Sequence, residues 1–92
     1  MAKVILSGYI LVAISELATV KDALLQHTEL TKQELGCLIF EVTQDSQDSC
    51  RFNVYEEFVD HASFAAHQSR VANSTWGEVT VNVERHYQIS PQ

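Results

Sequence analysis

The most constraining feature of this sequence is a run of ten residues near its start, Val4–Ala13 (VILSGYILVA), which is apolar at nearly every position. A half-exposed strand alternates apolar and polar side chains, whereas such a continuous run is typical of a strand covered on both faces. The chain has only 92 residues, which is room for one domain and few covering elements. We therefore expect a single domain over residues 1–92, with a small core that needs help from a partner.

Two stretches have the three- and four-residue spacing of amphipathic helices. The first runs from Glu16 to Leu35, with Ser15 as a candidate N-cap and Gly36 as the residue that ends it. Its apolar stripe consists of Leu17, Val20, Leu24, Thr28, Thr31 and Leu35, with His27 at the edge. The second helix, residues 61–72, follows the N-cap candidate Asp60. Its stripe holds Phe64, His67, Gln68 and Val71.

Three further segments have the composition of strands. Cys37–Gln44 and Arg51–Val59 flank a polar turn and predict a hairpin. On the second of these strands one face carries Phe52, Val54, Glu56 and Phe58, and the other carries Arg51, Asn53, Tyr55 and Glu57. From Val79 to His86 apolar and polar residues alternate, which predicts a last strand that ends near Ile89.

The order strand, helix, strand, strand, helix, strand predicts an α+β fold of the ferredoxin-like βαββαβ type, with a four-stranded antiparallel sheet and two helices on one face. Two helices cannot cover both faces of that sheet. We therefore expect a homodimer in which a second copy covers the other face.

Three segments together are similar to a known family: ELGCLIFEV (34–42), RFNVYEEFVD (51–60) and FAAHQS (64–69). An acidic residue two before Gly-Cys opens the second strand, Tyr55-Glu56-x-Phe58 ends the third, and His67 follows eleven residues after Glu56. This combination resembles the antibiotic biosynthesis monooxygenase (ABM) domain family, of the quinol monooxygenase type, over nearly the whole chain.

The resemblance implies a dimeric α+β barrel with a pocket between the sheet and the helices of each subunit. Some members oxidise aromatic polyketides or quinols with molecular oxygen and without metal, haem or flavin, so we expect no cofactor. Relatives include haem-degrading monooxygenases and an isomerase of a phosphorylated signal compound. The haem branch has a Trp in the second helix and a ligating His about ten residues later. In this chain His67 stands at the place of that Trp, and the region of the ligating His holds Trp76 instead, so haem is not expected.

Charge and motif content exclude several other classes. The net charge of −6 argues against a nucleic-acid partner, and the apolar run at the start is too short to cross a membrane. We expect Cys37 and Cys50 to be reduced thiols of a cytoplasmic protein. The four histidines have no metal-ligand spacing, so no metal site is expected, and each glycine stands alone, so no phosphate loop is expected.

The candidate catalytic residues are His67 as base and Glu56 as its partner. A histidine on a core stripe can take a proton from a phenol or hydroquinone near neutral pH. The ordinary alternatives are a buried histidine bonded to the sheet and a buried carboxyl satisfied by nearby donors.

Substrate contacts are expected from Trp76 as an aromatic wall, from His27 and Thr31 of the first helix, and from Phe40. Tyr55 and Asn53 also belong to this predicted set if their strand face lines the pocket; otherwise they meet the dimer partner. The sequence leaves that choice open. It predicts a cofactor-independent monooxygenase of a phenolic, quinol or polycyclic aromatic substrate. A non-catalytic ligand-binding dimer and an isomerase using Arg51, Arg70 and Arg85 remain as alternatives.

Overall fold

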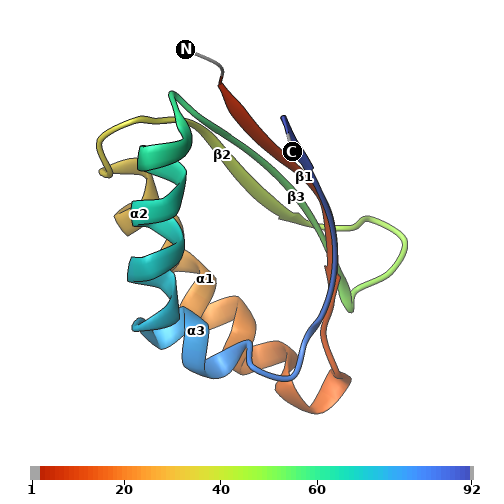
Figure 1. Ribbon diagram of the computed structural model, residues 1–92. Helices are drawn as coiled ribbons and strands as arrows, with labels where there is room; N and C mark the ends of the chain where they lie inside the picture. Colours follow the sequence, from red (N-terminus) through yellow and green to blue (C-terminus); the bar gives the residue numbers. More distant parts are fainter. Residues whose placement is uncertain (1–2, 92) are drawn as a thin grey trace.

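Four strands and a layer of helices make up the computed structural model, which describes residues 3–91 (Figure 1). The elements in chain order are β1 (Val4–Leu11), the 3-10 turn η1 (Ile14–Glu16), α1 (Leu17–Lys32), β2 (Cys37–Gln44), β3 (Arg51–Phe58), α2 (His61–Ala72), α3 (Thr75–Val79) and β4 (Glu84–Ser90). All strand pairs are antiparallel, and the order across the sheet is β2-β3-β1-β4. The helices lie together on one face of the sheet. This architecture confirms the predicted ferredoxin-like fold.

The core lies between that face and α1. Leu6 and Ile10 of β1 and Phe52 of β3 are at most 2% exposed, and they pack in one cluster with Val20 of α1. Gly8 lies between Leu6 and Ile10 on the same face of β1. A Cβ there would come within 1.9 Å of the carbonyl oxygen of His86, so glycine lets β4 pair closely with β1.

The first helix is shorter than predicted at both ends. Ser15 lies inside η1, and α1 begins after Glu16, which makes no side-chain capping bond. At the other end α1 stops at Lys32, because the chain turns through Gly36 (φ +85°) into β2. Leu35 was expected on the buried stripe, but it falls in this turn and is 95% exposed.

The last strand also starts later than predicted. The Ser74 hydroxyl accepts a hydrogen bond from the amide of Gly77, and α3 forms over Thr75–Val79. The hydroxyl of Thr80 then donates to the carbonyl of Trp76 and is fully buried. Alternation therefore gives the wrong structure for residues 79–83, since local capping bonds favour a helical turn. Only residues 84–90 form the predicted strand, as β4.

The other face of the sheet has no helix over it (Figure 1). On this face the ring of Tyr9 stacks on His86, with centroids 4.7 Å apart, and the guanidinium of Arg51 lies 3.8 Å above the same ring. Neighbouring Ile5 and Leu11 are only half-buried. Among residues 3–91, none of the helices combines the length and apolar composition needed to cross a bilayer.

Candidate active site

His67 is the one buried residue of α2 and lies at the centre of the candidate site. The helix begins at the predicted N-cap, because the side chain of Asp60 accepts a hydrogen bond from the Ser63 amide at 2.8 Å. Two turns later the imidazole of His67 faces the sheet, 3% exposed, with its ring 4.9 Å from that of Phe58. Of the other predicted stripe residues, Phe64 and Val71 are half-buried, whereas Gln68 is exposed, because it is turned away from the sheet.

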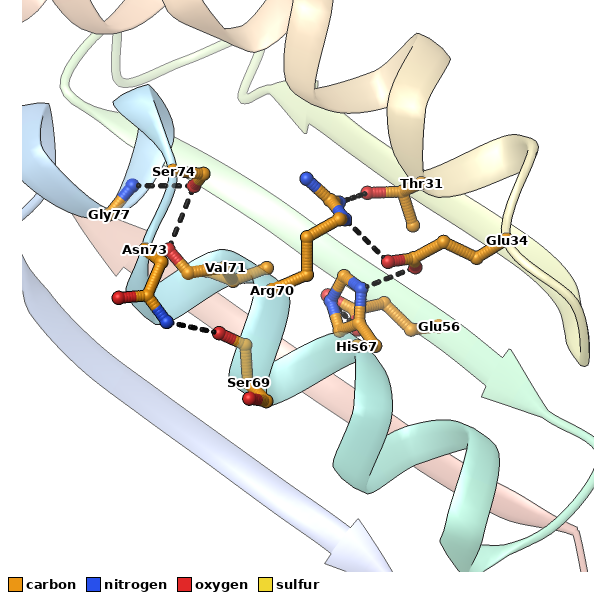
Figure 2. Close-up of polar contacts among 10 residues, drawn as sticks. All are labelled: Thr31, Glu34, Glu56, His67, Ser69, Arg70, Val71, Asn73, Ser74 and Gly77. Carbon is orange, nitrogen blue, oxygen red and sulfur yellow. Dashed lines mark hydrogen bonds and ion pairs between the residues drawn. The ribbon is translucent and has the colours of Figure 1, made fainter.

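One nitrogen of His67 is held by a network from the end of α1 and the turn that follows. Nδ1 lies 2.7 Å from Oε1 of Glu34, and Nε of Arg70 donates to Oε2 of the same carboxylate at 2.5 Å. Arg70 also donates to the hydroxyl of Thr31 at 3.0 Å (Figure 2). The predicted site residue Thr31 therefore anchors the arginine that neutralises Glu34.

The close approach of α2 to this turn depends on Gly36. A Cβ at Gly36 would lie 2.1 Å from Oγ and 2.5 Å from Cβ of Ser63. Ser63 and His67 are four residues apart and so share one face of α2. The missing side chain thus lets α2 come near enough for His67 to reach Glu34.

The second nitrogen of His67 faces Glu56, which projects from β3. Nε2 and Oε1 are 3.7 Å apart, and that oxygen has no hydrogen-bond partner although Glu56 is only 7% exposed. Burial, together with the charge of Glu34, raises the pKa of Glu56 to about 7. Burial also lowers the pKa of His67 below its ordinary value, although its hydrogen bond to the Glu34 carboxylate opposes the shift. At neutral pH the site thus holds a neutral imidazole beside a carboxyl that is partly protonated.

A cluster of aromatic rings adjoins His67. The rings of His27 and Trp76 stack with centroids 4.7 Å apart and within 2° of parallel, and the rings of His27 and Phe40 are nearly perpendicular with centroids 5.3 Å apart. Burial, with smaller effects of Arg70 and of His67 when protonated, lowers the pKa of His27 to about 3, so His27 is neutral at pH 7, and its buried Nδ1 has no partner.

His27 and Trp76 border a cavity of about 390 Å³ between α1 and the α2–α3 junction. Its remaining lining residues are Ala23, Gln26, Leu30, Arg70, Asn73, Ser74 and Thr75. His67 instead borders a smaller cavity of about 300 Å³ together with Glu34 and Ser63. Arg70 lies between the two and borders both.

The sequence profile of the antibiotic biosynthesis monooxygenase family matches residues 4–77, which include Glu34, Glu56, His67 and Trp76. The chain belongs to the ABM family. Comparison with curated proteins gave no match.

Solved structures with the same fold support the ABM assignment at the level of architecture. A protein named "putative antibiotic biosynthesis monooxygenase" from Nitrosomonas europaea has 23% identity and a TM-score of 0.77, and the match covers 95% of this chain and 84% of that one. A conserved protein of unknown function from Bacteroides thetaiotaomicron has 17% identity and a TM-score of 0.81, with coverages of 96% and 95%. MupZ from Pseudomonas fluorescens has 17% identity and a TM-score of 0.79, with coverages of 97% and 71%.

Within this ABM fold, six of the predicted site residues lie together on the helix-covered side. They are His27, Thr31, Phe40, Glu56, His67 and Trp76. Tyr55 and Asn53 lie on the opposite face of β3, where Tyr55 donates to Glu57 and Asn53 donates to Asp45 at 3.0 Å. Among residues 3–91 no group of three or more His, Cys, Asp and Glu side chains is arranged to hold a metal ion.

Two members of the site were not predicted as functional residues. In the sequence, Glu34 is only the acidic residue before Gly-Cys in the family pattern. Arg70 is only one of three arginines that the isomerase alternative would use. Arg70 follows His67 by three residues on α2, so the helical period places them on neighbouring positions. That spacing was the available signal for Arg70, whereas the contact of Glu34 with α2 depends on the turn at Gly36.

Proposed function

We propose that this ABM protein is a monooxygenase that oxidises a phenolic or quinol small molecule with molecular oxygen, and that His67 removes the first proton. The observation that carries the proposal is the placement of His67, which is buried and held at Nδ1 by Glu34, with burial lowering its pKa. A neutral imidazole with one nitrogen fixed in place can act as a general base through the other. Glu56 stands beside that second nitrogen as the proton partner.

The proposed reaction needs no added reductant. Removal of a proton from a hydroquinone gives an anion rich enough in electrons to pass one to oxygen, and the two radicals then join at a ring carbon. The protonated base returns its proton to the resulting peroxide anion, and loss of water from this hydroperoxide gives a hydroxyquinone. One oxygen atom enters the product, the other leaves as water, and the substrate supplies all the electrons.

The aromatic group beside the base supports a flat substrate. His27, Phe40 and Trp76 present ring faces and edges, and the ring of His27 lies 6.0 Å from that of His67. We propose that the substrate enters from the 390 Å³ cavity and separates Trp76 from His27, so that its hydroxyl reaches the base. The stacked pair therefore serves as the aromatic wall.

Oxygen consumption with a panel of hydroquinones, naphthols and anthrone-like phenols is the direct test. We expect turnover by the wild-type protein and a loss of at least about a hundredfold in kcat for His67→Gln. His61→Gln is the matched control, because His61 is an exposed histidine on the same helix. No turnover with any compound, or full activity in His67→Gln, would refute the proposal.

We also propose that the protein is a homodimer whose copies meet through the outer face of the sheet. That face has no helix over it and carries the stacked Tyr9 and His86 with Arg51 above them. Asn53 and Tyr55 lie on the same face, so in this proposal they contact the second copy rather than the substrate.

A non-catalytic binding module is the second candidate, and one observation favours it. Trp76 and His67 border different cavities. Saturable binding of hydroquinones without oxygen consumption would support this candidate. The isomerase alternative has less support, because Arg70 and Arg85 are engaged by Glu34 and Thr80 within the chain and Arg51 lies on the outer face.

A further inference from the structure

We propose that Glu34, neutralised by Arg70, is the positioning residue that keeps the proton of His67 on Nδ1 and turns the lone pair of Nε2 toward Glu56. The inference extends the proposed function, because it assigns roles to two residues outside the His67–Glu56 pair. It rests on the contacts drawn in Figure 2.

The carboxylate of Glu34 can only accept hydrogen bonds while it is ionised. Arg70 donates to one of its oxygens at 2.5 Å, a charge-assisted hydrogen bond. The other oxygen lies 2.7 Å from Nδ1 of His67, so Nδ1 must carry the hydrogen in that contact. In a neutral imidazole the proton cannot be on both nitrogens, and Nε2 is therefore the acceptor.

Arg70 is itself held in place. Its guanidinium donates a second hydrogen bond to the hydroxyl of Thr31, a residue of α1 that is fully buried. The arrangement thus runs from α1 through Arg70 and Glu34 to the imidazole of α2. Each member fixes the orientation of the next, as outer residues do around other reactive histidines.

The acceptor nitrogen then faces Glu56, whose carboxyl has a buried oxygen without a hydrogen-bond partner. Oε1 of Glu56 is 3.7 Å from Nε2, and the protonated form of Glu56 can donate into that lone pair with a small movement. The charged and titratable groups around the imidazole are Glu34 in the turn, Arg70 on α2, His27 on α1 and Glu56 on β3. Among these groups, only Glu34 is within hydrogen-bond distance of Nδ1.

Nitrogen NMR of the full-length protein labelled with ¹⁵N-histidine tests this directly, because protonated and unprotonated ring nitrogens have well-separated shifts. At pH 7 we expect the wild-type His67 signals to show hydrogen on Nδ1 and none on Nε2, assigned by comparison with His67→Gln. In Glu34→Ala we expect the proton to move to Nε2 or to be shared between both nitrogens. Glu29→Gln, an exposed carboxylate on α1, is the matched control and should leave the signals unchanged.

A wild-type spectrum with the proton on Nε2 would overturn the inference, and so would an unchanged spectrum in a folded Glu34→Ala. If Glu34→Ala does not fold, Arg70→Met serves as the second variant and should give a mixed signal. If this variant is also unfolded, the wild-type spectrum alone decides.

The same spectra separate this inference from the proposed function. If the protein oxidises hydroquinones, Glu34→Ala should lower kcat at least about tenfold with little change in KM, and it should move the pH profile. If no compound is oxidised, the proposed function fails, while the tautomer of His67 still supports or overturns the positioning role.

Discussion

The carboxyl oxygen Oε1 of Glu56 lies 3.7 Å from Nε2 of His67 and has no hydrogen-bond partner, although both side chains are buried. A buried carboxyl without a partner favours its protonated form, because the charged form has lost its hydration. The burial of Glu56 therefore makes the stability of the fold depend on pH in a direction opposite to that of an ordinary paired carboxylate.

Replacing Glu56 with Gln should change how stability depends on pH. The pKa of Glu56 is about 7 in the folded protein, above its ordinary value of 4.5, so its contribution to stability is full below pH 4.5 and is lost as pH rises through 7. Relative to wild type, we expect Glu56→Gln to gain about 2 to 3 kcal/mol in unfolding free energy between pH 5 and pH 8. Urea unfolding at both pH values measures this difference. An equal effect at both pH values would contradict it, and Glu29→Gln is the control.

His27→Phe should remove a loss of stability in acid. His27 has a pKa of about 3 in the folded protein, below its ordinary value of 6.5, so the unfolded chain takes up a proton first as pH falls. Between pH 7 and pH 5 this costs the wild type about 2 kcal/mol of unfolding free energy. Phenylalanine keeps the stack on Trp76 and does not titrate, so the variant should escape this loss. His61→Gln should behave like wild type, and identical pH profiles for wild type and His27→Phe would refute the assignment.

Gly36→Ala should destabilise the protein by on the order of 2 kcal/mol. A Cβ at this place would lie 2.1 Å from Oγ of Ser63, and the φ of +85° is strained for alanine. The double variant Gly36→Ala with Ser63→Gly removes the clash but not the strain. Measured against Ser63→Gly alone, alanine at Gly36 should therefore cost less than it does in the wild type. Equal costs in both backgrounds would show that α2 does not press on this turn.

Tyr9→Glu should convert the proposed homodimer into a monomer. The ring of Tyr9 lies between His86 and Arg51 on the sheet face without a helix, and a carboxylate there would have to be buried in the interface. Sedimentation equilibrium should give a mass near twice 10.4 kDa for the wild type and near 10.4 kDa for Tyr9→Glu. Leu25→Glu, at an exposed leucine of α1, should remain dimeric. A wild type that is already monomeric would refute the proposed interface.

Local signals predicted much of the fold. Helix α2 has the predicted bounds, because Asp60 caps its first turn and the stripe from Phe64 to Val71 follows the helical period. The residues that share a strand face with Glu56 were also predicted correctly, because the side chains of β3 alternate between its two faces as expected. The sequence could not say which face the helices cover, because both faces of β3 carry polar and apolar groups.

The errors and omissions arise where local capping bonds or tertiary contacts override the sequence pattern. Residues 79–83 alternate like a strand, yet the Ser74 cap and the Thr80 hydroxyl make them a helical end and a turn. Glu34 reaches His67 across 33 residues of sequence, which no periodicity reveals. Its place depends on the turn at Gly36, whose geometry is known only once α2 is packed against it.

The stacking of Trp76 on His27 has a practical consequence. Trp76 is the only tryptophan in the chain, and it borders the cavity through which the substrate is proposed to enter. Its fluorescence is therefore an intrinsic and site-specific optical signal. A compound that separates the two rings will change the emission of a single fluorophore, so candidate ligands can be screened on the unlabelled wild-type protein before any reaction is known.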